Sequence, residues 1–157
     1  METCSLCAGT SVQEFADFSL KFEGQMQRRR YWQCGRCQLI QLDRDQLVNA
    51  GEEKHRYTTH ENCKLDEGYL GYIKPALTYA RPYLAWSKPL RALDYGCGEG
   101  RPFQELFPPH WQCFHYDPLF FPQGRQEASE LDVIVCTEAA EHFHHPGIEW
   151  QWMVDHL

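Results

Sequence analysis

The segment LDYGCGEG, residues 93–100, is the feature that most constrains the fold of this chain. Its three glycines alternate with other residues directly after an apolar stretch that predicts a strand, and Asp94 stands at their entrance. Glycine is entropically costly to fix, so such a cluster indicates a backbone that turns tightly or lets a ligand approach closely. A glycine-rich turn that leads from a strand toward a helix places this ligand at the carboxyl edge of a parallel sheet. The segment therefore predicts a binding site in an α/β fold.

The second half of the chain alternates apolar strand patterns with helical ones. From residue 91 the order is strand, helix, strand, loop, strand and helix, which is typical of a Rossmann-like parallel sheet. The sequence supplies three to four such strands, so we expect a truncated sheet. The expected elements are strands over 91–95, 111–116 and 131–137, helices over 102–107 and 147–157, and a loop over 120–130.

The remainder of the chain precedes this partial Rossmann-like domain, which we place at residues 91–157. Residues 1–43 contain short strand patterns and few helical ones, and they predict a small β-rich lobe. Residues 44–90 are expected to form a helical cap or linker. Apolar residues recur there at helical spacing on both sides of Pro75, which predicts a kink or two short helices.

Two Cys-x2-Cys pairs lie in the first lobe, Cys4 with Cys7 and Cys34 with Cys37. Each pair can present two thiolates to one tetrahedral ion, so together they predict a closed structural zinc site in a zinc-ribbon-like lobe. Disulfides and a thioredoxin-like redox pair are the alternatives. Four thiolate ligands leave no open coordination position, so the Zn²⁺ ion would stabilise the lobe rather than take part in chemistry.

Charge and composition argue against several classes of protein. The formal net charge of −7 disfavours a nucleic-acid binder, although Arg28–Arg30 form a local basic patch. No apolar run has the length of a membrane span, and the N-terminal METCSLC lacks the pattern of a signal peptide. Without an export signal, the eight cysteines are expected to meet a reducing environment. We therefore expect a cytoplasmic protein with no membrane partner.

The pattern of the glycine loop narrows the class of ligand. A P-loop needs a lysine followed by Ser or Thr, and the dinucleotide fingerprint needs a third glycine where this chain has Arg101. An acid before the glycines disfavours a pyrophosphate and suits a cationic ligand. A second acid, Asp117, follows the next strand, where it can accept the two hydroxyls of a ribose. These features together point to S-adenosylmethionine, a nucleoside that carries a cationic amino acid.

These residues resemble the class I S-adenosylmethionine-dependent methyltransferases. The resemblance implies that the loop holds the methionine part and that the acid after the second strand holds the ribose. The segment 131–146 resembles the ubiquinone-biosynthesis type of O-methyltransferase, in which a Glu and a Glu-His pair follow the fourth strand. The cysteine lobe is similar to a subset that includes sugar C-methyltransferases. The implied cofactor-binding residues are Asp94, Tyr95, Gly96, Gly98, Asp117, Pro118 and Glu138.

The resemblance also implies residues that face the methyl acceptor. His142 is the best candidate for a catalytic base, because an unperturbed imidazole titrates near neutrality. Its alternative role is to order its loop by hydrogen bonding. His60 is the second catalytic candidate and belongs to a cap over the site together with Tyr57. Tyr69 and Tyr72 are cap candidates as well, but they also fit the apolar stripe of a helix, which favours a core role.

The chain departs from the family pattern in two respects. The segment between Asp117 and Leu131 has no room for a full helix and a third strand, so the adenine would rest on Leu119 or Phe120. The family fold has about seven strands, which suggests that an oligomer partner or a further C-terminal segment completes the sheet. We expect methyl transfer to a small molecule. The alternative is a catalytically silent zinc-ribbon scaffold, and RNA methylation ranks last.

Overall fold

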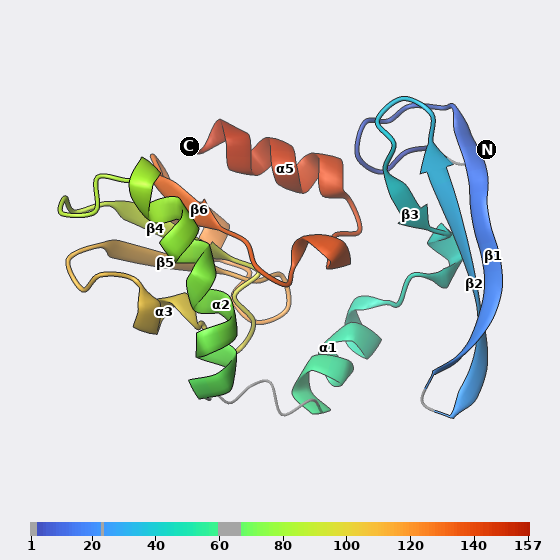
Figure 1. The fold of residues 1–157 in the computed structure, drawn as a ribbon, viewed down its shortest axis with the longest axis horizontal. Coiled ribbons are helices and arrows are strands. Elements are labelled where there is room, and N and C mark those ends of the chain that lie inside the picture. Colours follow the sequence, from blue (N-terminus) through green and yellow to red (C-terminus); the bar gives the residue numbers. More distant parts are fainter. Residues whose placement is uncertain (1–2, 23, 60–66) are drawn as a thin grey trace. The chain divides into compact units, whose positions relative to one another are not determined.

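The structure is a computed structural model that describes residues 3–22, 24–59 and 67–157. The chain divides into two compact units (Figure 1). The first comprises residues 1–49 and 143–151, and the second comprises residues 50–142 and 152–157. The division into 1–43, 44–90 and 91–157 stays a prediction.

The first unit is built on a three-stranded antiparallel sheet in the order β1-β2-β3. Strands β1 (Val12–Phe22) and β2 (Gln25–Cys34) form a long hairpin, and β3 (Ile40–Leu42) pairs with the end of β2. The Asp17 carboxylate accepts hydrogen bonds from the guanidinium of Arg28 on the neighbouring strand. A single-turn helix, η1 (Arg44–Gln46), follows. The predicted β-rich character of this lobe is confirmed.

The second unit alternates helices and parallel strands, as the sequence predicts. The helices α1 and α2 precede the sheet, and α3, η4 and α5 follow strands β4 and β6 (Figure 1). The elements are α1 (Ala50–Thr59), α2 (Glu67–Ala80), η3 (Arg81–Tyr83), β4 (Arg91–Tyr95), α3 (Phe103–Leu106), β5 (Gln112–Tyr116), α4 (Gly124–Glu127), β6 (Val133–Val135), η4 (Ala140–His142) and α5 (Pro146–Asp155).

The sheet of this unit has the order β5-β4-β6, and both neighbours of β4 run parallel to it. Asp94 on β4 is level with His115 on β5 and with Val135 on β6. The expected Rossmann-like α/β fold is therefore confirmed as a three-stranded parallel sheet. The chain passes from β4 to β5 on one side and later reaches β6 on the other. Ligands of open α/β sheets bind at such a switch point.

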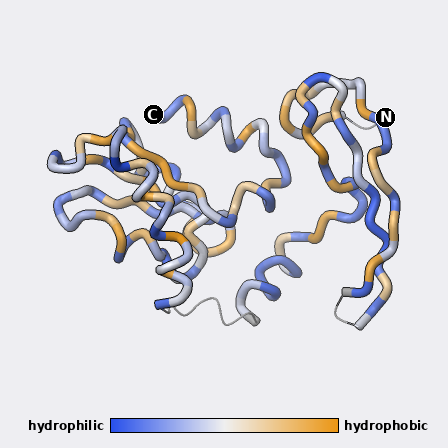
Figure 2. Tube along the Cα trace, in the orientation of Figure 1, coloured by the Kyte–Doolittle hydropathy of each residue, from blue (hydrophilic) through white to orange (hydrophobic). Residues whose placement is uncertain are grey.

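The core of the second unit lies between one face of this sheet and the helices α2 and α3. The strands of this sheet are mainly apolar, as the hydropathy along the trace shows (Figure 2), and buried side chains of α2 and α3 join them in the core. Burial of this surface is the main driving force for the fold. The buried members of the cluster are Ile73, Leu77, Leu90, Ala92, Phe103, Phe107, Trp111, Val133 and Val135.

The opposite side of the sheet carries an aromatic cluster around one guanidinium. Arg125 of α4 lies over the rings of Tyr95, Tyr116 and Trp152, at 4.5 to 5.1 Å from their centroids. Such cation–π contacts add to the burial of the rings. The cluster attaches α4 and the last turn of α5 to the strands.

Three local expectations are wrong in whole or, for the kink or two short helices expected at Pro75, in one of two alternatives. The stretch 120–130 contains the helix α4 rather than only a loop, because Gly124 lets its backbone lie directly on the carbonyl of His115. The helix α2 continues through Pro75, so two short helices do not form there. Pro75 and Gly71 are both exposed, so water can bind the carbonyl that proline leaves without a partner. Tyr72 is 63% exposed and is not a core residue.

Among the described residues, no helix is both long enough and apolar enough to cross a membrane.

Candidate functional site

The glycine loop leaves β4 at the carboxyl edge of the parallel sheet. Gly96 and Gly98 have φ angles of +77° and +58°, a conformation that side chains disfavour. A Cβ on Gly96 would overlap the side chain of Ala139, so this glycine is required for packing. A Cβ on Gly98 would meet no atom of the described residues within 4 Å. The loop is therefore closely packed at its start and borders open space at Gly98, where a ligand can approach the backbone.

Asp117 follows β5 and organises the same edge of the sheet. Its Oδ2 atom accepts a hydrogen bond from the backbone N–H of Gly98 at 3.0 Å. Its Oδ1 atom accepts hydrogen bonds from the N–H groups of Leu119 at 2.8 Å and Phe120 at 3.1 Å. A carboxylate offers about four acceptor positions. The described residues use three of them, so within this part of the chain Oδ2 retains the capacity to accept one further donor.

Asp94, the acid at the entrance of the loop, points into the protein. It is only 2% exposed, and its Oδ2 atom accepts the N–H of Phe103 at the start of α3, at 3.3 Å. Burial raises the pKa of Asp94 to about 7; the hydrogen bond from Phe103 opposes this rise, and the charge of Asp117 adds to it. Tyr95 is also buried, in the aromatic cluster around Arg125. The side chains of Asp94 and Tyr95 therefore support the glycine loop from the interior of the second unit.

Glu138 and Pro118 lie at the surface of this edge. Glu138 follows β6, has a φ of +51°, and accepts a hydrogen bond from the hydroxyl of Tyr72 on α2 at 3.0 Å. Left-handed backbone at a residue other than glycine is strained and is enriched at functional sites. The bond to Glu138 raises the pKa of Tyr72. The exposed Tyr72 thus contacts a predicted site residue, which its place in the apolar stripe did not indicate.

His142 ends the helix η4 and meets α1. The rings of His142 and Tyr57 lie edge to face, with centroids 5.8 Å apart. The imidazole Nε2 atom is 4.0 Å from the carboxylate of Glu141, and the His142 side chain is 50% exposed. Burial, followed by the charges of Glu53, Asp117 and Glu141, raises the pKa of Tyr57 to about 12. The phenol of Tyr57 therefore stays neutral beside these three acids.

Lys54 is a residue that the sequence reasoning missed. Its ammonium donates a hydrogen bond to the carbonyl of Leu119 at 3.0 Å and lies 5.4 Å from the ring centroid of Phe120. These contacts attach α1 to the turn after β5. A lysine among the charged residues of a helix carries no pattern that would have identified it. His60, the second catalytic candidate, lies outside the described residues.

The four cysteines of the two pairs converge in the first unit. Their sulfur atoms all lie within 4.8 Å of one another. The Sγ atoms of Cys4 and Cys37 are 3.5 Å apart, and those of Cys7 and Cys34 are 3.7 Å apart. A tetrahedral Zn²⁺ with bonds of about 2.3 Å requires sulfur separations of about 3.8 Å. The cluster therefore has the donor set and the dimensions that such an ion needs.

The two cysteine pairs adopt the same backbone turn. The N–H of Ala8 donates to the carbonyl of Cys4, and the N–H of Gln38 donates likewise to that of Cys34. Ala8 and Gln38 both have left-handed backbone, with φ of 54° and 65°. The backbone N–H groups of Cys37 and Arg36 lower the pKa of the Cys34 thiol to about 6. Repetition of one turn orients both pairs of thiols toward a common centre.

The comparisons with known proteins concern mainly the second unit. A family model described as a methyltransferase domain matches residues 66–157. The chain belongs to this methyltransferase domain family. The matched residues include the glycine loop, Asp117 and the segment after β6, and the cysteine pairs lie outside them. A search among curated proteins finds no match.

The methyltransferase domain implies S-adenosylmethionine as its methyl donor, and the residues at the sheet edge fit that group. The open space beside Gly98 gives access to backbone N–H and C=O groups. The remaining acceptor position of Asp117 matches a hydroxyl donor, and carboxylates suit a cationic ligand. The residues that could hold the donor are thus brought together at one edge, whereas Asp94 and Tyr95 support them from within the fold.

Proposed function

We propose that the chain binds S-adenosylmethionine at the carboxyl edge of the sheet β5-β4-β6 and transfers its methyl group to a small molecule. The observation that carries the proposal is the hydrogen bond from the Gly98 N–H to Asp117. It joins the two segments that a nucleoside ligand must contact at a switch point. The family match supports methyl transfer in general.

The roles that we propose for the residues that bind the methyl donor follow from the surroundings of each residue. The backbone of Gly96 and Gly98 would hold the methionine part, because no side chain in the described part of the chain lies within 4 Å of a Cβ placed on Gly98. The free acceptor position of Asp117 would take a ribose hydroxyl, and the turn at Pro118 would border the adenine. Bound S-adenosylmethionine supplies an electrophilic methyl group. Glu138 would place a negative charge near the amino group of the donor.

The residues that we propose to face the methyl acceptor lie on α1 and η4. His142 is half exposed and can take a proton from an acceptor through its imidazole, and the nearby Glu141 carboxylate, at 4.0 Å, favours the protonated ring that results. Tyr57 contacts the His142 ring and would exclude water from it. His60 remains a catalytic candidate from the sequence. An acid-rich edge with Asp117, Glu138 and Glu141 is better suited to a neutral or cationic acceptor than to RNA.

We further propose that Cys4, Cys7, Cys34 and Cys37 bind one structural Zn²⁺. The convergence of their sulfur atoms within 4.8 Å supports it. Four thiolates close the coordination sphere, so the ion would stabilise the first unit and leave methyl transfer to the second. The cytoplasmic location inferred from the cysteine content stays a prediction.

A second candidate function has one observation in its favour. In the described part of the chain, the parallel sheet has three strands, and β5 and β6 each pair on one side only. Unpaired strand edges recruit other chains. The alternative is therefore a catalytically silent zinc-ribbon scaffold, whereas in an active protein a second copy or a further segment would complete the sheet.

Transfer of a labelled methyl group separates these functions. The intact zinc-loaded chain would be incubated with methyl-labelled S-adenosylmethionine and either a small-metabolite fraction or purified total RNA, with Asp117→Ala as the matched control. We expect Asp117-dependent label in the small-molecule fraction. Label in RNA alone would replace the proposed acceptor class. No label in either fraction, from a chain that binds the donor, would favour the scaffold.

A further inference from the structure

The first turn of α5 is attached to the first cysteine pair through Gly147. The N–H of Gly147 donates a hydrogen bond to the carbonyl of Ser5 at 3.1 Å. A Cβ at position 147 would overlap the carbonyl of Leu6 and would lie 3.1 Å from that of Ser5. Because these atoms belong to the backbone, they cannot turn aside. Glycine at this position is therefore what lets the helix approach the turn between Cys4 and Cys7.

The turn that receives α5 is fixed from its other side by β3. The N–H and the hydroxyl of Ser5 donate to the Oε1 atom of Gln41, at 2.8 and 3.1 Å. The side-chain amide of Gln41 donates in turn to the carbonyl of Thr3 at 3.2 Å. Ser5 and Leu6 are also the two residues between the ligands Cys4 and Cys7. An ion bound by these thiolates would therefore fix the carbonyls on which Gly147 rests.

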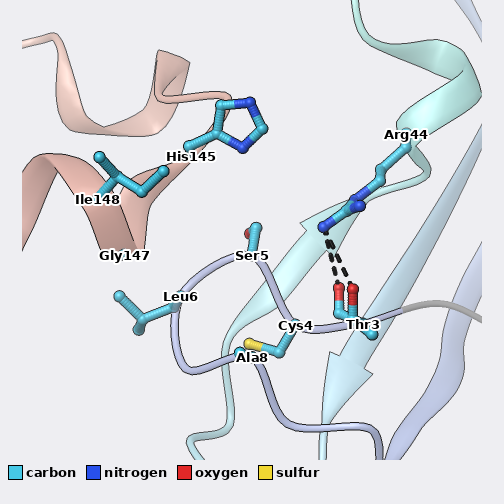
Figure 3. Close-up of a pocket in the computed structure, with 9 residues that line it drawn as sticks. All are labelled: Thr3, Cys4, Ser5, Leu6, Ala8, Arg44, His145, Gly147 and Ile148. Carbon is cyan, nitrogen blue, oxygen red and sulfur yellow. Dashed lines mark hydrogen bonds between the residues drawn. The ribbon is translucent and has the colours of Figure 1, made fainter.

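The first turn of α5 exposes much of its apolar surface, although the rings of Trp150 and Phe143 contact each other. Ile148 is 64% exposed and Trp150 is 43% exposed. The N–H groups of Ile148 and Glu149 donate to the carbonyl of His145 within the same segment. Met153, the buried residue of α5, lies beyond this turn. Figure 3 shows Leu6 and Ser5 facing the start of the helix, around a pocket that Arg44 and His145 also line. The contact of Gly147 with the cysteine turn is thus a close backbone anchor of this turn.

We propose that metal loading of the four cysteines orders the first turn of α5 through the contact of Gly147 with Ser5 and Leu6. This inference rests on the proposed zinc site. Without the ion, the turn between Cys4 and Cys7 loses its metal bonds and depends on its hydrogen bonds to Gln41, so the orientation of the Ser5 carbonyl relaxes. The affected turn begins four residues after His142 in the sequence. Metal binding in the first unit would therefore order a segment that closely follows His142, the proposed acceptor-side residue, along the chain.

Hydrogen exchange of the full chain, followed by mass spectrometry, tests the coupling. The zinc-loaded protein is compared with protein stripped by a chelator, and peptides from β4 and β5 serve as internal references. We expect exchange over residues 147–151 to accelerate about tenfold or more when zinc is removed, with little change in β4 and β5. Equal exchange in both forms, from protein shown to hold one zinc, would overturn the inference. A chain that holds no zinc would instead overturn the proposed metal site.

Gly147→Ala separates this contact from a general loosening of the first unit. The variant should expose residues 147–151 to fast exchange while zinc is present, because the added Cβ forces the helix away from Leu6. Weaker zinc binding by the variant would also support the coupling, since linkage is reciprocal. Gly71→Ala is the matched control, because a Cβ there meets none of the residues that the structure describes within 4 Å. Unchanged protection of the α5 turn in Gly147→Ala would contradict the inference.

Discussion

Asp117 holds the glycine loop by accepting the backbone N–H of Gly98 at 3.0 Å, so one carboxylate joins the ends of two neighbouring parallel strands. The same carboxylate holds the turn at Leu119 and Phe120. A single side chain therefore sets the shape of both segments that border the open space at Gly98. The proposed donor site depends on this residue more than on Asp94, which faces the interior.

Replacement of Asp117 by alanine should weaken binding of S-adenosylhomocysteine by about tenfold or more, because hydrogen bonds to a charged group contribute about 1.5–3 kcal/mol. Calorimetric titration measures the change. The zinc content should stay the same, since the cysteines lie in the other unit. Glu105→Ala, an exposed acid on α3, is the control and should bind as the parent does. Unchanged affinity in Asp117→Ala would remove Asp117 from the site.

Asp94 should make the stability of the chain depend on pH. Its pKa is about 7 in the folded protein against 3.8 as the ordinary value, so the folded state binds the proton more tightly. The resulting stabilisation is present at low pH and is lost as the pH rises through about 7. Asp94→Asn keeps an acceptor for Phe103 and has no such charge. The difference in Tm between this variant and the parent should therefore be larger, in favour of the variant, at about pH 8 than at about pH 5. An equal difference at the two pH values would contradict the raised pKa of Asp94.

Gly124→Ala should destabilise the second unit strongly. The added Cβ would overlap the carbonyl of His115, so α4 must move away from β5. Overpacking typically costs about 1–3 kcal/mol or more. Gly71→Ala, within α2 and free of contacts, should instead be neutral or stabilise by up to about 1 kcal/mol. Urea unfolding of both variants provides the comparison, and equal stabilities would show that α4 does not rest on β5.

Cys34→Ser should reduce the zinc content of the purified chain toward zero. The substitution removes one of the four sulfur donors, and the remaining three cannot complete the closed tetrahedral site. Atomic absorption gives the stoichiometry directly. Cys113→Ser, at a half-buried position of β5, is the control and should keep one equivalent. A full equivalent of zinc in Cys34→Ser would mean that other residues bind the metal.

Patterns that are local in the sequence predicted most of the fold. The alternation of strands and helices from residue 91, the loop at Gly96 and Gly98, and the position of Asp117 at the end of a strand all depend on a few adjacent residues. The spacing within each cysteine pair also fixed its turn, because Ala8 and Gln38 take the same left-handed conformation. Convergence of the two pairs then required only that β1 and β2 form a hairpin.

Features that depend on distant residues could not be predicted in this way. The helix α4 forms because Gly124 meets the carbonyl of His115, and no local pattern shows how closely two backbones approach. The inward orientation of Asp94 depends on the position of the Phe103 N–H. Gly147 and Ser5 are separated by most of the chain, and nothing near either residue indicates their contact.

The most direct test of a donor site at the glycine loop is a calorimetric titration of the zinc-loaded chain with S-adenosylhomocysteine. We predict saturable binding of one equivalent at micromolar strength or better, which corresponds to about −8 kcal/mol. This result would show that three parallel strands suffice to form the site. Absence of binding by a chain shown to be folded would contradict the proposal and would leave the loop as a structural turn.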